Sequence, residues 1–137
     1  MTLGFATGLH NEISVQDLGL DNRTAADGLA VGRASGFVGK FIMPFISGSY
    51  TLDDDRMFVM LADLAETEDI RLEPSALAGM YGPVLTAKDE RFSEYLKKEG
   101  IAGSVKNGIQ LVWATGGNMV PENEIEGYIA RGTELRD

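Results

Sequence analysis

The most regular apolar pattern of the chain lies near its C-terminal end. Four apolar or small residues, from Leu111 to Ala114, lead into the hydroxyl of Thr115 and a Gly-Gly-Asn bend. An uninterrupted apolar run that ends at a turn is typical of a strand in a parallel sheet covered on both faces. Ligands of open α/β sheets bind at the carboxyl ends of the strands, so Thr115 is a candidate ligand contact. An ordinary strand and turn with an incidental threonine is the alternative interpretation.

Helical patterns occupy much of the remaining sequence. Pro121, followed by several glutamates, predicts a helix after the bend, because proline suits the first turn and acids suit the positive end of a helix. A second helix is predicted over roughly 29–46, although Gly32, Gly36 and Gly39 interrupt it. Each glycine costs a helix roughly 1 kcal/mol, which suggests that this segment packs closely against backbone or ligand.

Consecutive aspartates at 53–55 precede the strongest helical pattern. The apolar residues on one face of this helix are Met57, Phe58, Met60, Leu61 and Leu64, with acidic residues opposite. A metal cluster is one interpretation of the aspartates, but capping of the helix N-terminus explains them more simply. The short segment 49–52 just before them is a strand candidate.

A carboxylate and a proline stand together at Leu72-Glu73-Pro74-Ser75. Pro74 predicts the start of a helix, and the small residues of 76–79 would let that helix approach a sheet or a ligand closely. Glu73 is then either a carboxylate at the end of a strand or a surface acid near a helix N-terminus. Another helix is predicted near 88–99.

The length and composition fit one globular domain. The chain has 137 residues, of which 44% are hydrophobic and 24% are charged. Strands that alternate with helices predict an α/β fold, with parallel strands covered by helices. The formal charge of −9 argues against nucleic acid and anionic membrane surfaces as partners.

Several kinds of site are excluded by residue type. The chain has no cysteine, which excludes disulfides and thiolate metal sites and is consistent with the cytoplasm. With no basic-then-apolar start and no long apolar run, neither a signal peptide nor a membrane span is expected. His10 is the only histidine, so a zinc site or a serine triad is not supported. A phosphate loop would need glycine at Ala34 and a hydroxyl at Phe41.

Four segments together resemble the bacterial D-serine dehydratases, also called D-serine ammonia-lyases. They are Val15–Asn22, Thr24–Gly39, Arg71–Gly79 and Leu111–Gly117. Three landmarks within them recur in the wider group of fold-type II pyridoxal-phosphate enzymes: an Ala-Asp-Gly turn, a Glu-Pro pair that opens a small-residue helix, and a Thr-Gly-Gly strand end. The resemblance implies that residues 1–137 are the C-terminal part of the large domain of such an enzyme.

The resemblance also implies roles for five residues. Thr115 matches the hydroxyl that hydrogen-bonds the pyridine nitrogen of pyridoxal 5'-phosphate, and a neutral partner leaves that nitrogen mostly unprotonated. Gly28 matches the glycine whose backbone lies on one face of the ring, a contact that a Cβ would block. Glu73 matches a carboxylate near the ring edge, and Gly116 and Gly117 shape the turn beside Thr115. We therefore expect Thr115, Gly28 and Glu73 to face one concavity.

The implied reaction converts D-serine to pyruvate and ammonia by β-elimination, and the sequence does not separate D-serine from D-threonine as substrate. The resemblance also implies dependence on a monovalent cation. In this family a Schiff-base lysine within a short Ser-x-Lys motif, and the phosphate-binding loops, belong to the N-terminal half of the enzyme, which we expect to lie outside this chain. The chain alone should therefore be inactive and should need an N-terminal chain that carries the lysine.

A non-catalytic module is the alternative: an acidic domain that binds a partner and keeps the ancestral sequence without its chemistry. A truncated product, a cloned fragment and one chain of a split enzyme are all compatible with the sequence. Strands without their upstream neighbours would expose a sheet edge and an apolar face, which pair with other chains. We therefore expect the chain to self-associate.

Overall fold

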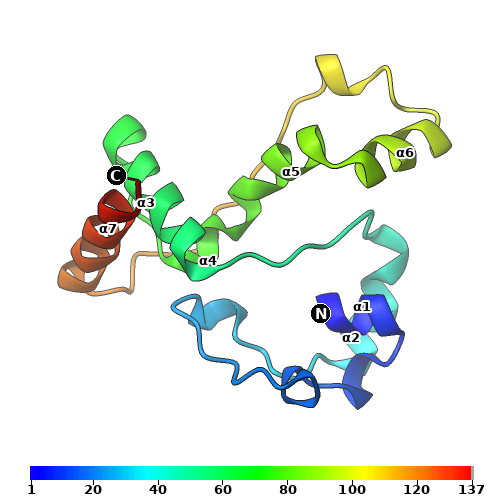
Figure 1. The fold of residues 1–137 in the computed structure, drawn as a ribbon, viewed down its shortest axis with the longest axis horizontal. Coiled ribbons are helices and arrows are strands. Elements are labelled where there is room, and N and C mark those ends of the chain that lie inside the picture. The colour runs from blue at the N-terminus through cyan, green and yellow to red at the C-terminus, as the bar shows by residue number, and fades with distance from the viewer. Residues whose placement is uncertain (137) are drawn as a thin grey trace.

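A computed structural model describes residues 1–136, and its regular elements are all helices (Figure 1). The expected α/β fold with parallel strands is wrong for this chain, because the described residues contain no strand. Their only β-type pairing is an isolated antiparallel bridge between Ser14 and Arg33. A strand needs a neighbour for its backbone hydrogen bonds, and this chain supplies none to the strand candidates 49–52 and 111–114.

The first part of the chain folds as short helical turns. The elements are α1 (Thr2–Thr7), η1 (His10–Glu12), η2 (Val15–Leu18), η3 (Asp27–Leu29), α2 (Gly36–Ile42) and η4 (Met43–Phe45). His10 is buried between α1 and α2. A Cβ on Gly4 would lie 2.8 Å from its Nδ1, and one on Gly39 would lie closer still. Glycine at both positions lets the two helices close over the imidazole.

The helix predicted over 29–46 is only partly present. Helical structure begins at Gly36, after Ser35, whose side chain accepts a hydrogen bond from the N–H of Val38 (3.3 Å). Upstream of this cap, Arg33 forms the bridge to Ser14 instead. The low helix propensity of glycine and the side-chain cap at Ser35 together favour a helix that starts late.

The consecutive aspartates begin α3 (Asp54–Glu68), as predicted. Asp53 is the N-cap residue, and its side chain accepts a hydrogen bond from the N–H of Arg56 (2.8 Å). The capping interpretation is therefore confirmed for Asp53. Asp54 and Asp55 have other partners, described below.

Helix α7 (Glu122–Arg136) lies beside α3 and runs in the same direction (Figure 1). Arg131 pairs with Asp55 at the start of α3, at 3.4 Å, whereas Arg136 pairs with residues near its end. Gly132 lies at the closest approach, where a Cβ would overlap the carbonyl of Phe58. The two helices are thus held together by close backbone packing and by ion pairs near both ends of α3.

The middle of the chain contains α4 (Pro74–Leu77), η5 (Ala78–Tyr81), α5 (Gly82–Lys88), α6 (Glu90–Lys98) and η6 (Val105–Asn107). Pro74 opens α4 as predicted, and α6 matches the helix predicted near 88–99. Helix α4 packs on α3. The buried residues of α3, α4 and α7 include Met57, Leu61, Ala62, Pro74, Ala76, Leu77 and Ile125.

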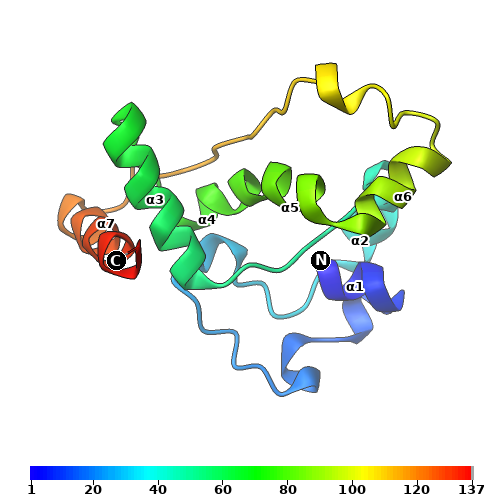
Figure 2. The ribbon, with the colours of Figure 1, turned by 45° about the horizontal axis from the view of Figure 1, so that its top comes forward.

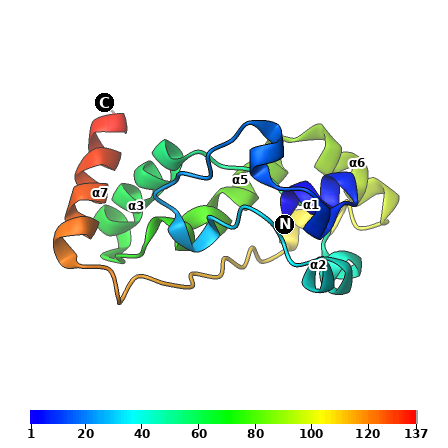
Figure 3. The same ribbon diagram turned by 90° about the horizontal axis from the view of Figure 1, so that it is seen from below.

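The helices form an open arrangement (Figures 2 and 3). The pair α3 and α7 lies at one end and α1 with α2 at the other, while the segment from η6 to α7 runs back along the molecule without regular structure. The accessible surface is 9609 Å², about a third more than the ~7,000 Å² expected for a folded monomer of this mass. Among the helices described, none is both long and apolar enough to cross a membrane.

The apolar run at 111–114 shows where the extra surface comes from. Its predicted burial is wrong for this chain, because Leu111 is 82% exposed and Trp113 is 78% exposed. Val112 points the other way, toward Gly79, where a Cβ would lie 3.6 Å from it. One face of this segment therefore contacts η5 and the other contacts solvent.

Candidate functional site

Glu73 is the residue at which three distant segments of the chain meet. It is the N-cap residue of α4, just before Pro74, and its side chain is half-buried. The Oγ of Ser75 donates a hydrogen bond to Glu73 Oε1 (3.1 Å). Because proline has a fixed φ and no N–H, the helix begins at Pro74, and Glu73 keeps an extended backbone just outside it.

The first distant segment brings Gly28 to this carboxylate. Gly28 belongs to η3, which packs on α4. A Cβ on Gly28 would lie 2.9 Å from Ser75 Oγ and 3.4 Å from Glu73 Oε1. Glycine allows the backbone to pass directly against these two side chains.

The second distant segment brings Gly116 and Gly117 to the same place. A Cβ on Gly116 would lie 2.7 Å from both Cδ and Oε1 of Glu73. Gly117 has a φ of +141°, which side-chain-bearing residues rarely adopt, and a Cβ there would lie 2.8 Å from the Cα of Leu72. A Cβ at Gly116 would displace the end of the Glu73 side chain, whereas Gly117 is required by both space and backbone conformation.

Thr115 lies next to this cluster in the chain, with its side chain exposed. The structure thus brings Gly28, Glu73, Gly116 and Gly117 together, and it leaves the hydroxyl of Thr115 free to meet solvent. Glu73 is a half-buried acid at the N-terminus of α4, and glycine backbone from two segments lies against its carboxylate.

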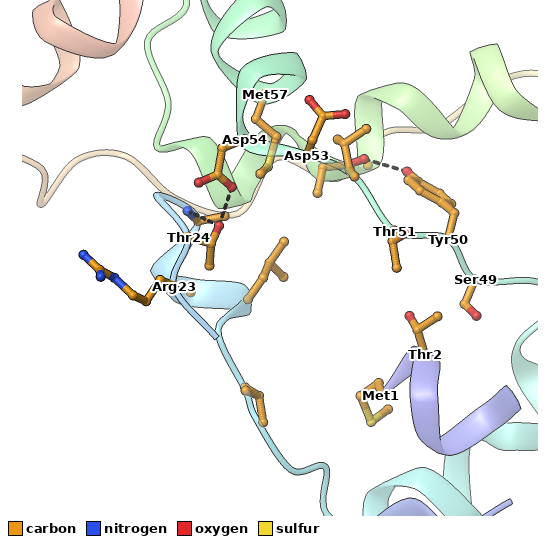
Figure 4. Close-up of a pocket in the computed structure, with 17 residues that line it drawn as sticks. Met1, Thr2, Arg23, Thr24, Ser49, Tyr50, Thr51, Asp53, Asp54 and Met57 are labelled. Atoms are coloured by element: carbon orange, nitrogen blue, oxygen red, sulfur yellow. Dashed lines mark hydrogen bonds between the residues drawn. The ribbon is translucent and has the colours of Figure 1, made fainter. Parts of the chain in front are cut away.

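A cavity in the described part of the chain shares Gly28 with this cluster (Figure 4). It has a volume of about 830 Å³ and lies between the 23–31 loop, the 49–54 segment and η5. Neither Glu73 nor Thr115 lines this cavity. Gly28 is therefore the residue that links the glutamate cluster to the cavity.

Two polar side chains shape the cavity wall (Figure 4). The Tyr50 hydroxyl donates a hydrogen bond to the carbonyl of Ala78 (2.5 Å), and burial raises the pKa of the phenol. Asp54 accepts hydrogen bonds from Thr24 Oγ1 (2.5 Å) and from the N–H of Ala25 (2.7 Å). These interactions tie the two loops that border the cavity to α3 and η5.

The chemistry available at Glu73 is that of one carboxylate beside bare backbone. It can accept hydrogen bonds, and glycine at 28 and 116 lets the main chain of two segments lie directly against it. Arg71, the nearest basic residue in sequence, is paired with Glu126 of α7. Among the described residues, no group of three or more His, Cys, Asp or Glu side chains could hold a metal ion.

An expected absence of the Ser-x-Lys pattern from this chain is wrong, because Ser104-Val105-Lys106 fits it. The pattern runs from the N-cap residue of η6 into that helix, outside the glutamate cluster. The Lys106 side chain lies outside the part of the structure that is described. A three-residue pattern is a weak signal, and the match does not by itself identify a Schiff-base lysine.

No protein-family model matches the chain. Curated bacterial proteins do match: 135 residues, 98% of the chain, are 56% identical to a protein of Bacillus mycoides strain KBAB4 named "Probable D-serine dehydratase". Proteins with the same name from Bacillus cereus strain G9842 and Bacillus thuringiensis subsp. konkukian strain 97-27 are 55% and 53% identical. The chain spans 30% of the length of these relatives. Nearly all of it is therefore similar to one part of bacterial proteins named probable D-serine dehydratase.

Proposed function

We propose that residues 1–137 are the C-terminal part of the catalytic domain of a pyridoxal-phosphate-dependent D-serine dehydratase. The complete enzyme would release pyruvate and ammonia from D-serine by β-elimination. Identity of 56% over 135 residues to the Bacillus mycoides relative supports this proposal. The observation that carries it is the meeting of Gly28, Gly116 and Gly117 at Glu73. The resemblance assigns residues of three separate motifs to the cofactor site, and in the structure the glycines of two of these motifs contact Glu73 of the third.

The residues of this chain fit one edge of the cofactor. In the proposed site Gly28 and Gly116 hold two main-chain segments directly against Glu73 and Ser75, and Thr115 offers an exposed hydroxyl for the pyridine nitrogen. Glu73 provides a carboxylate for the ring edge. The phosphate does not fit at this place, because the negative charge of Glu73 repels it. Residues outside this chain would have to hold the phosphate.

Each of these residues has a defined task in the proposed site. Pyridoxal phosphate would supply the electron sink for loss of the α-proton and departure of the β-hydroxyl. Thr115 gives the pyridine nitrogen a neutral hydrogen-bond partner, so that the nitrogen is not held protonated. Ser75 orients the Glu73 carboxylate through its 3.1 Å hydrogen bond. Gly28 and Gly116 let two main-chain segments lie against the Glu73 carboxylate and so help to hold it in place.

The rest of the enzyme is required for activity in this proposal. The accessible surface of the chain is larger than expected for its mass, and Leu111 and Trp113 are exposed. Both observations support the proposal that further polypeptide packs on this part of the molecule. We propose that the remaining polypeptide, or a separate N-terminal chain, covers these residues and brings the Schiff-base lysine. The complete enzyme would also use a monovalent cation, as the resemblance implies.

A chimaera tests the proposed site. In it, this chain replaces the matching segment of the Bacillus mycoides relative, and pyruvate release from D-serine is measured. Thr115→Val should lower kcat about tenfold and change the absorption of the bound cofactor, since one hydrogen bond to the ring contributes about 1 kcal/mol. Glu73→Gln should weaken cofactor binding.

Matched controls separate these effects from general damage. Thr67→Val and Glu90→Gln make the same chemical changes at exposed positions on α3 and α6. Both controls should stay within about twofold of the unchanged chimaera, as surface substitutions usually do. A Thr115→Val chimaera with unaltered activity and spectrum would exclude the proposed role of Thr115.

A further inference from the structure

The aspartates at 53–55 are used in three different ways. Asp53 caps its own helix through the N–H of Arg56, and Asp55 pairs with Arg131 of α7. Asp54, at the first position of α3, directs its carboxylate away from the helix toward the 24–28 loop (Figure 4). The sequence pattern alone assigns all three to helix capping, and only the partners distinguish them.

Asp54 fixes the loop at two consecutive residues. Its Oδ1 accepts a hydrogen bond from Thr24 Oγ1 (2.5 Å), and its Oδ2 accepts one from the N–H of Ala25 (2.7 Å). The Thr24 hydroxyl also accepts a hydrogen bond from the N–H of Ala26 (3.0 Å), whose side chain is buried. One carboxylate therefore satisfies the backbone and side chain of a turn almost thirty residues away in sequence.

The fixed turn leads directly to Gly28. Two residues separate Ala25 from Gly28, whose backbone lies against Ser75 and the Glu73 carboxylate. Thr24, Gly28 and Asp54 also line the same cavity. A change in the turn at Thr24 would move Gly28 relative to Glu73, because the two residues between Ala25 and Gly28 are too few to absorb the displacement.

We infer that Asp54 is a positioning residue: its hydrogen bonds to Thr24 and Ala25 set the place of Gly28 against Glu73, and through it the binding of the cofactor by the complete enzyme. The inference rests on the proposed function for its consequence in the enzyme. Asp54 itself contacts neither Glu73 nor Gly28 through a hydrogen bond and is not a catalytic residue. Its effect is carried by the loop.

Two measurements test this inference. In the 137-residue chain, amide hydrogen exchange at Ala25 and Ala26 is followed by NMR. In the chimaera, the dissociation constant of pyridoxal phosphate, kcat and KM are measured. Asp54→Ala and Thr24→Val should each speed exchange at Ala25 or Ala26 about tenfold and raise the cofactor dissociation constant about tenfold, which corresponds to roughly 1.4 kcal/mol. Thr24→Ser should leave both the exchange rate and the dissociation constant within about threefold of the unchanged protein, because it keeps the hydroxyl.

Asp55→Asn is the matched control, since it removes a carboxylate from the same helical turn without touching the loop. It should leave exchange at Ala25 and cofactor affinity within about twofold of the unchanged protein. An equal effect of Asp55→Asn would overturn the inference, because helix charge would then be the cause. Unchanged cofactor affinity in Asp54→Ala, beside faster exchange at Ala25, would also overturn it.

The proposed function fails by a different result. If the unchanged chimaera does not bind pyridoxal phosphate, the proposed function is wrong and the role of Asp54 in cofactor binding falls with it. If the unchanged chimaera binds the cofactor and the Asp54→Ala and Thr24→Val chimaeras bind it equally well, only the inference about Asp54 is wrong.

Discussion

At the scale of single residues, glycines mark the candidate site more clearly than its polar side chains do. Gly28 and Gly116 face the same carboxylate from two segments, and Gly117 adopts a φ of +141° beside them. The sequence identified these positions through motifs, and it identified Glu73 only as one of two alternatives. The hydrogen bonds of Asp54 could not be predicted, because hydrogen-bond partners thirty residues apart leave no local pattern.

Alanine at Gly116 and at Gly117 should have different consequences. A Cβ at Gly116 meets the end of the flexible Glu73 side chain, which can swing aside, whereas a Cβ at Gly117 meets the backbone of Leu72. Gly116→Ala should therefore cost less than about 1 kcal/mol of stability but lower the activity of the chimaera at least tenfold. Gly117→Ala should cost about 1–3 kcal/mol because of its backbone conformation. Thermal unfolding and pyruvate assays measure both, and equal stability losses would contradict this account.

At the scale of elements, helices were predictable and their partners were not. The starts of α3 and α7 follow from Asp53 and Pro121, which act locally through capping and the proline φ. The pairing of these two helices depends on Gly132, whose fit against Phe58 no local pattern reveals. The strand predicted at 111–114 failed for the same reason, since a strand depends on a neighbour that this chain does not supply.

Two glycines of α7 provide a matched test of this helix pair. Gly132→Ala places a Cβ on the carbonyl of Phe58 and should destabilise the chain by about 1–3 kcal/mol through overpacking. Gly127→Ala meets no atom within 4 Å and should stabilise it by up to about 1 kcal/mol through helix propensity. Chemical denaturation followed by circular dichroism measures both. Destabilisation by Gly127→Ala, or none by Gly132→Ala, would show that the helices do not pack in this way.

At the scale of the whole molecule, the chain exposes more surface than a folded monomer of its mass is expected to expose. Phe37, Phe41 and Phe45 form an exposed row on α2 and η4, in which the first two rings stack and the third is tilted. A second exposed apolar face lies at Leu111 and Trp113. Length and composition predicted one globular domain, and neither quantity reveals how much apolar surface the folded chain leaves exposed. The relatives, of which the chain spans 30%, give a physical reason for an uncovered surface.

The isolated chain should therefore self-associate at micromolar concentrations. Burial of apolar surface contributes about 25 cal/mol per Å², whereas repulsion from the net charge of −9 is screened within about 10 Å at 0.1 M salt. Sedimentation equilibrium over a concentration series measures the mass. Replacing Leu111 and Trp113 by Ser should weaken the association, whereas Leu18→Ser, at a separate exposed site on η2, should not. A monomer at every concentration would favour the independent-module alternative.

Pyruvate release from D-serine tests the central claim most directly: that this chain is one part of a D-serine dehydratase and acts only together with the rest. The assay compares the 137-residue chain, the relative without its matching segment, and the chimaera, each with pyridoxal phosphate and with L-serine as the control substrate. The account predicts pyruvate from the chimaera with D-serine and none from either part alone. Pyruvate from the isolated chain, with borohydride trapping of the cofactor on Lys106, would contradict it, as would a folded, cofactor-loaded chimaera that leaves D-serine unchanged.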